Sequence, residues 1–189
     1  NKAMERADVV LLVIDASDGI TEQDQHIGGY VLDANKSVVI VVNKWDAVAK
    51  ETMTQHEFEQ ELAEKFNFLP DPPAVFISAL TGQRIHEVLE VANQVFEGRH
   101  FRIPTSELNR LIRDSYQKHT PPIRGTRRLK IMYASQVATA PPLILFHVND
   151  PKLVHFTYKR FLENQIRLEY PFPGTPLRMS FRSRSGMDE

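Results

Sequence analysis

The sequence predicts an α/β fold with a parallel sheet in residues 1–100, followed by an α+β module in residues 101–189. Continuous apolar runs at residues 9–14 and 38–42 are separated by helix signals, which is typical of buried parallel strands joined by helices. The later elements instead follow the order helix, strand, strand, helix, strand. The charge changes sign at the same place: residues 1–100 carry 8 basic and 17 acidic side chains, and residues 101–189 carry 15 and 7. We therefore expect two domains with different partners.

The elements of the first half follow in order. Strands are expected at residues 9–14, 38–42 and 74–77, with a helix over 21–34. A second helix begins after Thr54, because Glu57 three residues later completes a capping box. The last helix of this half is predicted to bury a stripe made of Ile85, Val88, Leu89, Ala92 and Phe96.

Two elements of the second half carry specific expectations. Alternation predicts that one strand buries the face made of Leu129, Ile131, Tyr133 and Val137. Asn149 or Asp150 is expected to cap a helix that has Pro151 at its first position.

Composition excludes several classes of protein. The 189 residues are 42% apolar and include no cysteine, so disulfides and thiolate metal sites are impossible. None of the seven histidines pairs with another at metal-ligand spacing beside an acidic partner, so no metal site is expected. No apolar stretch reaches the length of a membrane span and no signal peptide is present, which predicts a soluble cytoplasmic protein. Because the chain begins at Asn1, we expect that the native protein starts further upstream.

Asn43-Lys44-Trp45-Asp46 directly follows the second apolar strand. A parallel strand delivers such side chains to the carboxyl edge of the sheet, where open α/β sheets bind ligands. One carboxylate at Asp46 can accept both the N1–H and the N2 amino hydrogens of guanine, a pattern that adenine lacks. The aliphatic stem of Lys44 is expected to lie across the purine and Asn43 to tie the loop to nearby backbone. Trp45 either covers one side of the loop or packs in the core.

A second short motif strengthens the guanine interpretation. Ser78-Ala79-Leu80 follows the third strand, so it occupies the next strand end of the same sheet. Backbone N–H groups there are expected to donate to guanine O6, while Ser78 braces the loop. Either motif alone also occurs by chance in ordinary turns. Asp15, which ends the first strand, is read as the cap of the following turn in preference to a catalytic group.

With these motifs in place, the chain resembles the Der (EngA) family of tandem-domain bacterial GTPases. In the first half the resemblance is carried by ERADVVLLVIDA at 5–16, GITEQD at 19–24, VIVVNKWD at 39–46 and FISAL at 76–80. In the second half it is carried by Pro121-Pro122, Arg127, Lys130, Tyr133, Pro141-Pro142, FLEN at 161–164 and Gly174-Thr175-Pro176. The resemblance covers essentially the whole chain.

The resemblance implies that residues 1–100 are the guanine-recognition half of a P-loop-type GTPase domain and that residues 101–189 are a KH-like domain. It also implies a GTPase of large-ribosomal-subunit assembly that binds GTP or GDP, with an upstream GTPase domain in the same chain. The family's phosphate-binding loop, Gly-x-x-x-x-Gly-Lys-Ser/Thr, is absent from these 189 residues. We therefore expect the fragment alone to be inactive, to hold no catalytic residue, and to depend on the complete protein for Mg²⁺.

Basic residues of the second half are candidate contacts for RNA or the ribosome. Arg124, Arg127, Arg128 and Lys130 cluster before one strand, and Arg178, Arg182 and Arg184 are expected to share one side of the last strand. Arg124-Gly125-Thr126-Arg127 offers one glycine where KH domains use a Gly-x-x-Gly loop, so ordinary KH clamping is not expected. The alternatives are rRNA or ribosomal-protein contact, or an intramolecular role. The alternative for the whole chain is a non-catalytic RNA- or ribosome-binding adaptor with a vestigial guanine pocket.

Overall fold

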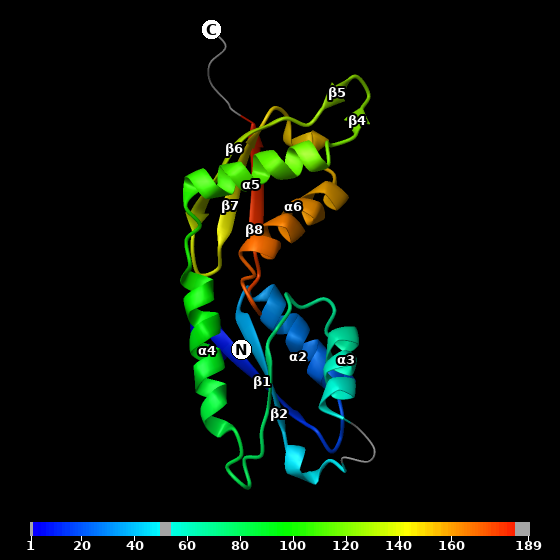
Figure 1. The fold of residues 1–189 in the computed structure, drawn as a ribbon, viewed down its shortest axis with the longest axis vertical. Helices are drawn as coiled ribbons and strands as arrows, with labels where there is room; N and C mark the ends of the chain where they lie inside the picture. The colour runs from blue at the N-terminus through cyan, green and yellow to red at the C-terminus, as the bar shows by residue number, and fades with distance from the viewer. Residues whose placement is uncertain (1, 50–53, 184–189) are drawn as a thin grey trace. The chain divides into compact units, whose positions relative to one another are not determined.

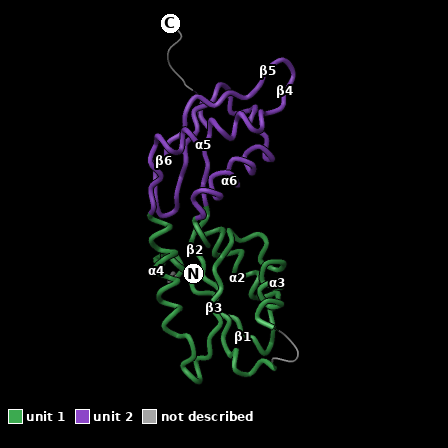
Figure 2. The backbone as a smooth tube through the Cα atoms, in the orientation of Figure 1, with its two compact units in different colours: residues 1–100, 172–176 green, residues 101–171, 177–189 purple. Residues whose placement is uncertain are grey.

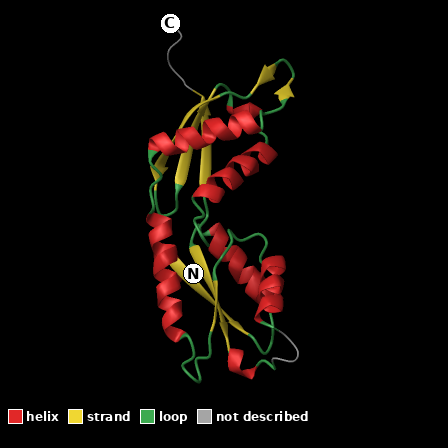
Figure 3. Ribbon diagram, in the orientation of Figure 1, coloured by secondary structure: helices red, strands yellow, loops and turns green. Residues whose placement is uncertain are grey.

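The computed structural model describes residues 2–49 and 54–183, which fold into two compact units (Figure 2). Unit 1 comprises residues 1–100 and 172–176, and unit 2 comprises residues 101–171 and 177–189. Each unit contains both helices and strands (Figure 3). Within the described residues, no helix combines the length and the apolar character needed to cross a membrane.

The sheet of unit 1 is parallel, as the sequence predicts. It consists of β1 (Val9–Asp15), β2 (Ser37–Asn43) and β3 (Ala74–Phe76), in the order β1-β2-β3. The register pairs Asp15 with Asn43 and Val42 with Phe76. The carboxyl ends of all three strands therefore meet at one edge of the sheet.

Helices cover both faces of this sheet, giving three layers (Figure 1). The helices are α1 (Lys2–Arg6), α2 (Glu22–Asp33), α3 (Gln55–Lys65) and α4 (Ile85–His100), with a short 3₁₀ helix, η1 (Trp45–Ala47). Thr54 and Glu57 form the predicted capping box of α3, and Thr21 and Asp24 form another at α2. Leu12 and Ile40 face α2 and α3, whereas Val39 and Val41 face α4.

The predicted apolar stripe of α4 is wrong in part. Val88 is buried, but Ile85, Leu89 and Phe96 are 42%, 68% and 43% exposed. The inward face runs instead through Val88, Val95 and Arg99. Helix α4 packs mainly on β2 and also contacts β1 and β3, but it leaves part of β1 open: Leu11 and Val13, the register partners of Val39 and Val41, are 41% and 56% exposed. The described residues thus leave apolar side chains of β1 and α4 uncovered.

Residues 172–176, which we call the 172–176 turn, complete unit 1 from a distant part of the sequence. The Gly174 carbonyl accepts the Val38 N–H at 2.8 Å, and the Gly174 N–H donates to the Pro70 and Asp71 carbonyls at 2.9 and 3.0 Å. The hydroxyls of Ser37 and Thr175, both fully buried, lie 2.8 Å apart. The turn therefore satisfies backbone and side-chain groups at the start of β2.

A buried arginine joins the same region. Arg99 of α4 is 2% exposed, and its Nη1 donates to the Asn35 carbonyl at 3.0 Å and to the Ser37 hydroxyl at 3.3 Å. Its Nε donates to Asp8 at 3.4 Å. Arg99, predicted by no apolar pattern, therefore ties α4 to the amino-terminal end of the sheet.

Unit 2 has the predicted order of main elements. It contains α5 (Thr105–Lys118), β6 (Ile131–Ala138), β7 (Leu143–Val148), α6 (Phe156–Glu169) and β8 (Arg178–Ser183). In the sheet β6-β7-β8, β6 is antiparallel to β7, and β8 is parallel to β7. Helices α5 and α6 lie over this sheet (Figure 1). A small hairpin of β4 (Ile123–Arg124) and β5 (Arg127–Arg128), absent from the predicted order, precedes β6.

One local expectation for unit 2 is wrong, and a second is confirmed for the cap but not for the type of helix. Leu129 is buried, but Tyr133 and Val137 are 45% and 49% exposed, while Ala134 and Gln136 are buried. A register shift between Ile131 and Tyr133 changes the phase of β6, which a strict two-residue alternation cannot anticipate.

The expected cap at Asp150 and the position of Pro151 are confirmed, but the helix that they start is a short 3₁₀ helix and not the long helix α6. Asp150 caps a 3₁₀ helix, η2 (Pro151–Leu153), by accepting the Lys152 N–H. Helix α6 begins only at Phe156, where the side chain of His155 caps it by accepting the Thr157 N–H at 3.3 Å.

Candidate functional site

The carboxyl edge of the unit 1 sheet brings the two predicted guanine motifs together. The loop after β2 is bonded on both sides, because the Ala16 N–H donates to the Asn43 carbonyl at 2.9 Å and the Trp45 N–H donates to the Ile77 carbonyl at 3.0 Å. Residues 43–46 are therefore held between the ends of β1 and β3.

Asn43 links this loop directly to the second motif. Its Oδ1 accepts the Ala79 N–H at 3.0 Å, across 36 residues of sequence. Ser78 is fully buried; its Oγ accepts the Thr81 N–H at 3.2 Å and its carbonyl accepts the Gly82 N–H at 2.9 Å, which closes the turn. The predicted bracing roles of Asn43 and Ser78 match these bonds.

The Ala79 N–H already has an acceptor in this structure. A contact from Ala79 to guanine O6 thus requires that N–H to be shared with, or released from, Asn43. The Leu80 N–H makes no hydrogen bond within the described residues, and the Leu80 side chain is 89% exposed.

Lys44 occupies a left-handed conformation, with φ 60° and ψ 31°, that starts the η1 helix. Its Nζ forms an ion pair with Asp15 at 2.5 Å, and Asp15 also accepts the Ser17 N–H at 3.0 Å. The hydrogen bond from Lys44, followed by that from Ser17, lowers the pKa of Asp15 to about 2, and Asp15 in turn raises the pKa of Lys44. The predicted turn cap at Asp15 is confirmed, and its pairing with Lys44 was missed.

The sequence did hold a signal for this pair. Asp15 and Lys44 follow neighbouring apolar strands, and parallel strands place their carboxyl ends side by side. The ion pair anchors the amino end of the Lys44 side chain at the end of β1.

Replacing Lys44 by methionine is expected to raise the pKa of Asp15 from about 2 toward the ordinary value of 3.8, because the largest cause of the shift is removed. Carboxyl carbon chemical shifts followed by NMR over pH 1.5–6 measure this change. Since the folded-state pKa is depressed, the pair stabilises the protein above about pH 4 and its contribution disappears as the pH falls toward 2.

A matched control is Lys65→Met, which removes a different ion pair of unit 1, that between Lys65 and Glu61 at 2.7 Å. Asp15 should titrate as in the wild type in this variant. An Asp15 carboxyl that still titrates near 2 in Lys44→Met would contradict the assignment.

Asp46 and Trp45 point to different roles within η1. Asp46 is exposed and makes no hydrogen bond or ion pair with residues 2–49 or 54–183. Trp45 contacts the core edge-on, with ring centroids 4.7 Å from Phe76 and 5.7 Å from Phe58. Of the two alternatives for Trp45, the structure favours packing in the core. Because the Asp46 carboxylate is exposed and has no partner among the described residues, it is available to accept hydrogen bonds from a ligand.

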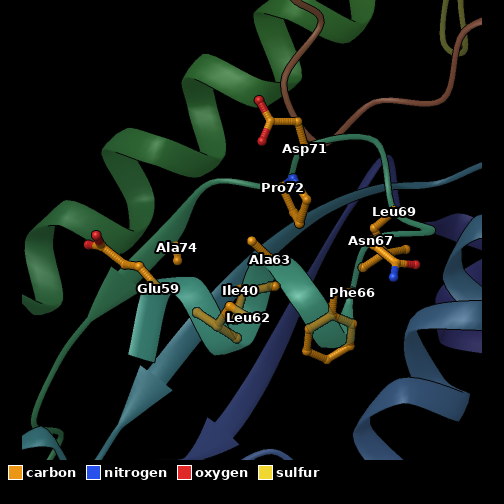
Figure 4. A pocket seen from close by; sticks show the side chains of 10 residues that line it. All are labelled: Ile40, Glu59, Leu62, Ala63, Phe66, Asn67, Leu69, Asp71, Pro72 and Ala74. Carbon is orange, nitrogen blue, oxygen red and sulfur yellow. The ribbon is translucent and has the colours of Figure 1, made fainter. Parts of the chain in front are cut away.

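A separate hollow of about 480 Å³ lies along α3 and the chain before β3 (Figure 4). It is lined by Ile40, Glu59, Leu62, Ala63, Phe66, Asn67, Leu69, Asp71, Pro72 and Ala74. None of these belongs to the two motifs, so this hollow is distinct from the predicted base site.

The predicted basic contacts form two groups in unit 2. Arg124, Arg127 and Arg128 lie on the exposed β4–β5 hairpin, where Arg127 pairs with Asp150 at 3.2 Å, and Lys130 precedes β6. Arg178 and Arg182 are exposed and four residues apart on β8, so they share one side of that strand. Strands β6 and β8 are opposite edges of the sheet. Arg184 lies outside the described residues.

Comparison with protein families matches each half of the chain separately. Residues 1–98 match the family described as elongation factor Tu GTP binding domain. Residues 102–182 match the family described as KH-domain-like of EngA bacterial GTPase enzymes, C-terminal.

Curated relatives match across both halves. The chain is 46% identical over 189 residues to GTPase Der of Chloroflexus aggregans and 47% identical over 182 residues to GTPase Der of Clostridium botulinum. These alignments cover 100% and 96% of the chain but only 42% of each relative's length.

A solved structure of Era in complex with MgGDPNP and nucleotides 1506–1542 of 16S ribosomal RNA is 21% identical, covering 96% of this chain and 67% of that one. Its TM-score of 0.42 is too low to add to the assignment.

Proposed function

The chain belongs to the EngA (Der) family of bacterial GTPases, with an elongation factor Tu type GTP-binding domain in residues 1–98, and on this premise we propose that unit 1 recognises the guanine base of GTP and GDP. The observation that carries the proposal is the bond from the Ala79 N–H to Asn43 Oδ1, which joins two motifs that are separate in sequence. In this proposal Asp46 accepts the N1–H and N2 hydrogens of guanine, and Asn43 and Ser78 hold the two loops in place.

Lys44 contributes to the base site by position. Its ammonium group is held by Asp15, so its aliphatic stem is the part available to cover the purine. The Leu80 backbone N–H donates to guanine O6, and Ala79 adds a second donor by sharing its N–H between O6 and Asn43. A bound base would cover the exposed Asp46 carboxylate, and adenine would leave that carboxylate unpaired, which is costly and gives the site its selectivity for guanine.

The complete protein, in this proposal, hydrolyses GTP in the cytoplasm during assembly of the large ribosomal subunit. The 189 residues contain no phosphate-loop motif, so we assign phosphate binding, Mg²⁺ and hydrolysis to the complete protein and not to these residues alone. Unit 2 is assigned contact with rRNA through the β4–β5 hairpin and Lys130, with Arg178 and Arg182 as a second contact. Positive side chains contribute a salt-dependent attraction to phosphates that is largely independent of sequence.

Sedimentation of the full-length gene product with large ribosomal subunits tests the proposal. We expect co-sedimentation that differs at least about 10-fold between a non-hydrolysable GTP analogue and GDP, a coupling within the usual range for two-state proteins. The same measurement with an ATP analogue is the control for base recognition. Equal association in all nucleotide states would overturn the proposal in favour of a nucleotide-independent adaptor.

A further inference from the structure

A hollow in unit 2 was not anticipated by any sequence motif. It has a volume of about 580 Å³ and lies between α5 and the start of β6. It is lined by Asn109, Ile112, Arg113, Tyr116 and Gln117 of α5 and by Lys130, Ile131, Met132 and Tyr133. This volume is within the range of small-molecule binding sites, so it can accommodate a flat heterocycle.

The charge of the lining has one sign. Arg113 and Lys130 are both exposed, and neither side chain forms an ion pair within the described residues. Among the described residues, no carboxylate lines the hollow. Two cations without neutralising partners favour an anionic ligand.

The lining also presents aromatic rings in fixed positions. The Tyr116 hydroxyl donates to the Leu129 carbonyl at 2.9 Å, which orients that ring. Tyr133 stacks on His147 with ring centroids 4.2 Å apart and an interplanar angle of 15°, yet it remains 45% exposed. Rings held in this way serve as platforms on which nucleobases stack.

A register shift of β6 lies within the part of the strand that lines the hollow. Regular alternation would place Met132 and Tyr133 on opposite faces, but the shift lies between Ile131 and Tyr133 and both side chains are about half exposed beside the hollow. Bulges of this kind re-aim side chains and are common beside functional sites. The irregularity that defeated the sequence pattern is therefore part of the site.

The chain itself connects the hollow to the basic hairpin. Strand β5 ends at Arg128, Leu129 is buried, and Lys130 lines the hollow. Arg124 and Arg128 are exposed on that hairpin and form no ion pair within the described residues. Phosphates flanking a bound base thus have cations available on the adjoining segment.

We propose that the α5–β6 hollow binds an unstacked base of single-stranded RNA, with Tyr133 as the stacking platform and Arg113 and Lys130 on the flanking phosphates. The inference rests on the proposed RNA contact of unit 2 and locates a base-binding site within it. Single-stranded RNA is favoured over an acidic peptide because the site combines cations with exposed aromatic rings, which a carboxylate-rich peptide does not require.

The test uses fluorescence anisotropy of the full 189-residue chain with fluorescein-labelled decauridylate and with an abasic ribose-phosphate decamer. We expect the wild type to prefer decauridylate. Tyr133→Leu should weaken decauridylate binding about 10-fold, because loss of one stacked base has an effect of this size, and should leave the abasic decamer unaffected. Tyr133→Phe keeps the ring and should bind as the wild type does, which separates stacking from a folding defect.

Arg113→Gln and Arg160→Gln form a matched pair. Both arginines are exposed on helices of unit 2, but only Arg113 lines the hollow. Both variants lose one positive charge, so a general electrostatic effect should be the same in each. Arg113→Gln should nevertheless weaken decauridylate binding several-fold more than Arg160→Gln, because only Arg113 lines the hollow.

Equal effects of these two variants, or no effect of Tyr133→Leu, would overturn the proposal. The proposal would also be overturned if polyglutamate displaced the labelled RNA as well as unlabelled decauridylate does at equal charge concentration. That result would indicate that the hollow binds an acidic peptide. If Tyr133→Leu has no effect on decauridylate binding but the full-length protein still associates with the large subunit in a nucleotide-dependent way, the proposal for the hollow is wrong and the proposed function stands.

Discussion

Gly174→Ala is expected to destabilise unit 1 by about 2–4 kcal/mol, although residue 174 is far in sequence from the rest of that unit, residues 1–100. Gly174 has φ +61°, a conformation that side chains other than glycine rarely adopt. A Cβ atom would also lie 2.2 Å from the Val38 carbonyl oxygen and 3.2 Å from a ring carbon of Pro73. Because the nearest obstacle is backbone of the central strand, relief requires the turn to leave its place on β2.

The measurement is urea unfolding followed by the fluorescence of Trp45, the single tryptophan, which packs in the core of unit 1. Gly19→Ala is a matched control, because Gly19 also lies in unit 1 and has φ +72°, but a Cβ there would meet nothing within 4 Å. The control should cost about 1–2 kcal/mol, from the backbone conformation alone. Equal losses in the two variants would mean that the close approach to Val38 contributes nothing.

Asp46→Asn is expected to weaken GDP binding by the full-length gene product about 100-fold and to strengthen binding of xanthosine diphosphate. The carboxylate accepts two hydrogens from guanine, and charge-assisted bonds of this kind contribute about 1.5–3 kcal/mol each. An asparagine in its place offers one acceptor and one donor. That pattern matches xanthine, which carries a carbonyl where guanine has its amino group.

Competition between guanosine and xanthosine diphosphates for a fluorescent nucleotide measures this exchange. Asp18→Asn is the control, because it removes an exposed carboxylate close enough to influence Lys44 without belonging to either motif. Its base preference should equal that of the wild type. Guanine selectivity that survives in Asp46→Asn would remove the basis of the proposed function.

Sequence patterns were reliable where a structure depends on nearby residues. The strands β1 and β2 follow from continuous apolar runs, and the α3 start follows from Thr54 and Glu57, whose side chains and backbones bond locally. The adjacency of Asn43 and Ala79 also follows from the sequence, because it requires only a parallel sheet and two strand ends.

The errors arise where distant residues decide the outcome. The inward face of α4 depends on what covers it, and Arg99 is buried because Asp8, Asn35 and Ser37 supply its partners. The exposed face of Tyr133 depends on a bulge whose position a two-residue period cannot encode. The partnership of Gly174 with Val38 links residues that no local pattern connects.

The 172–176 turn also affects how genetic data on this protein should be read. The polypeptide passes from unit 1 to unit 2, returns for five residues, and leaves again. A mutational scan arranged along the gene would therefore show a narrow band of intolerance at the codon for Gly174, inside the region that encodes the second unit. Such a band would report damage to unit 1, and variants found there in sequencing surveys belong with those of residues 37 and 38.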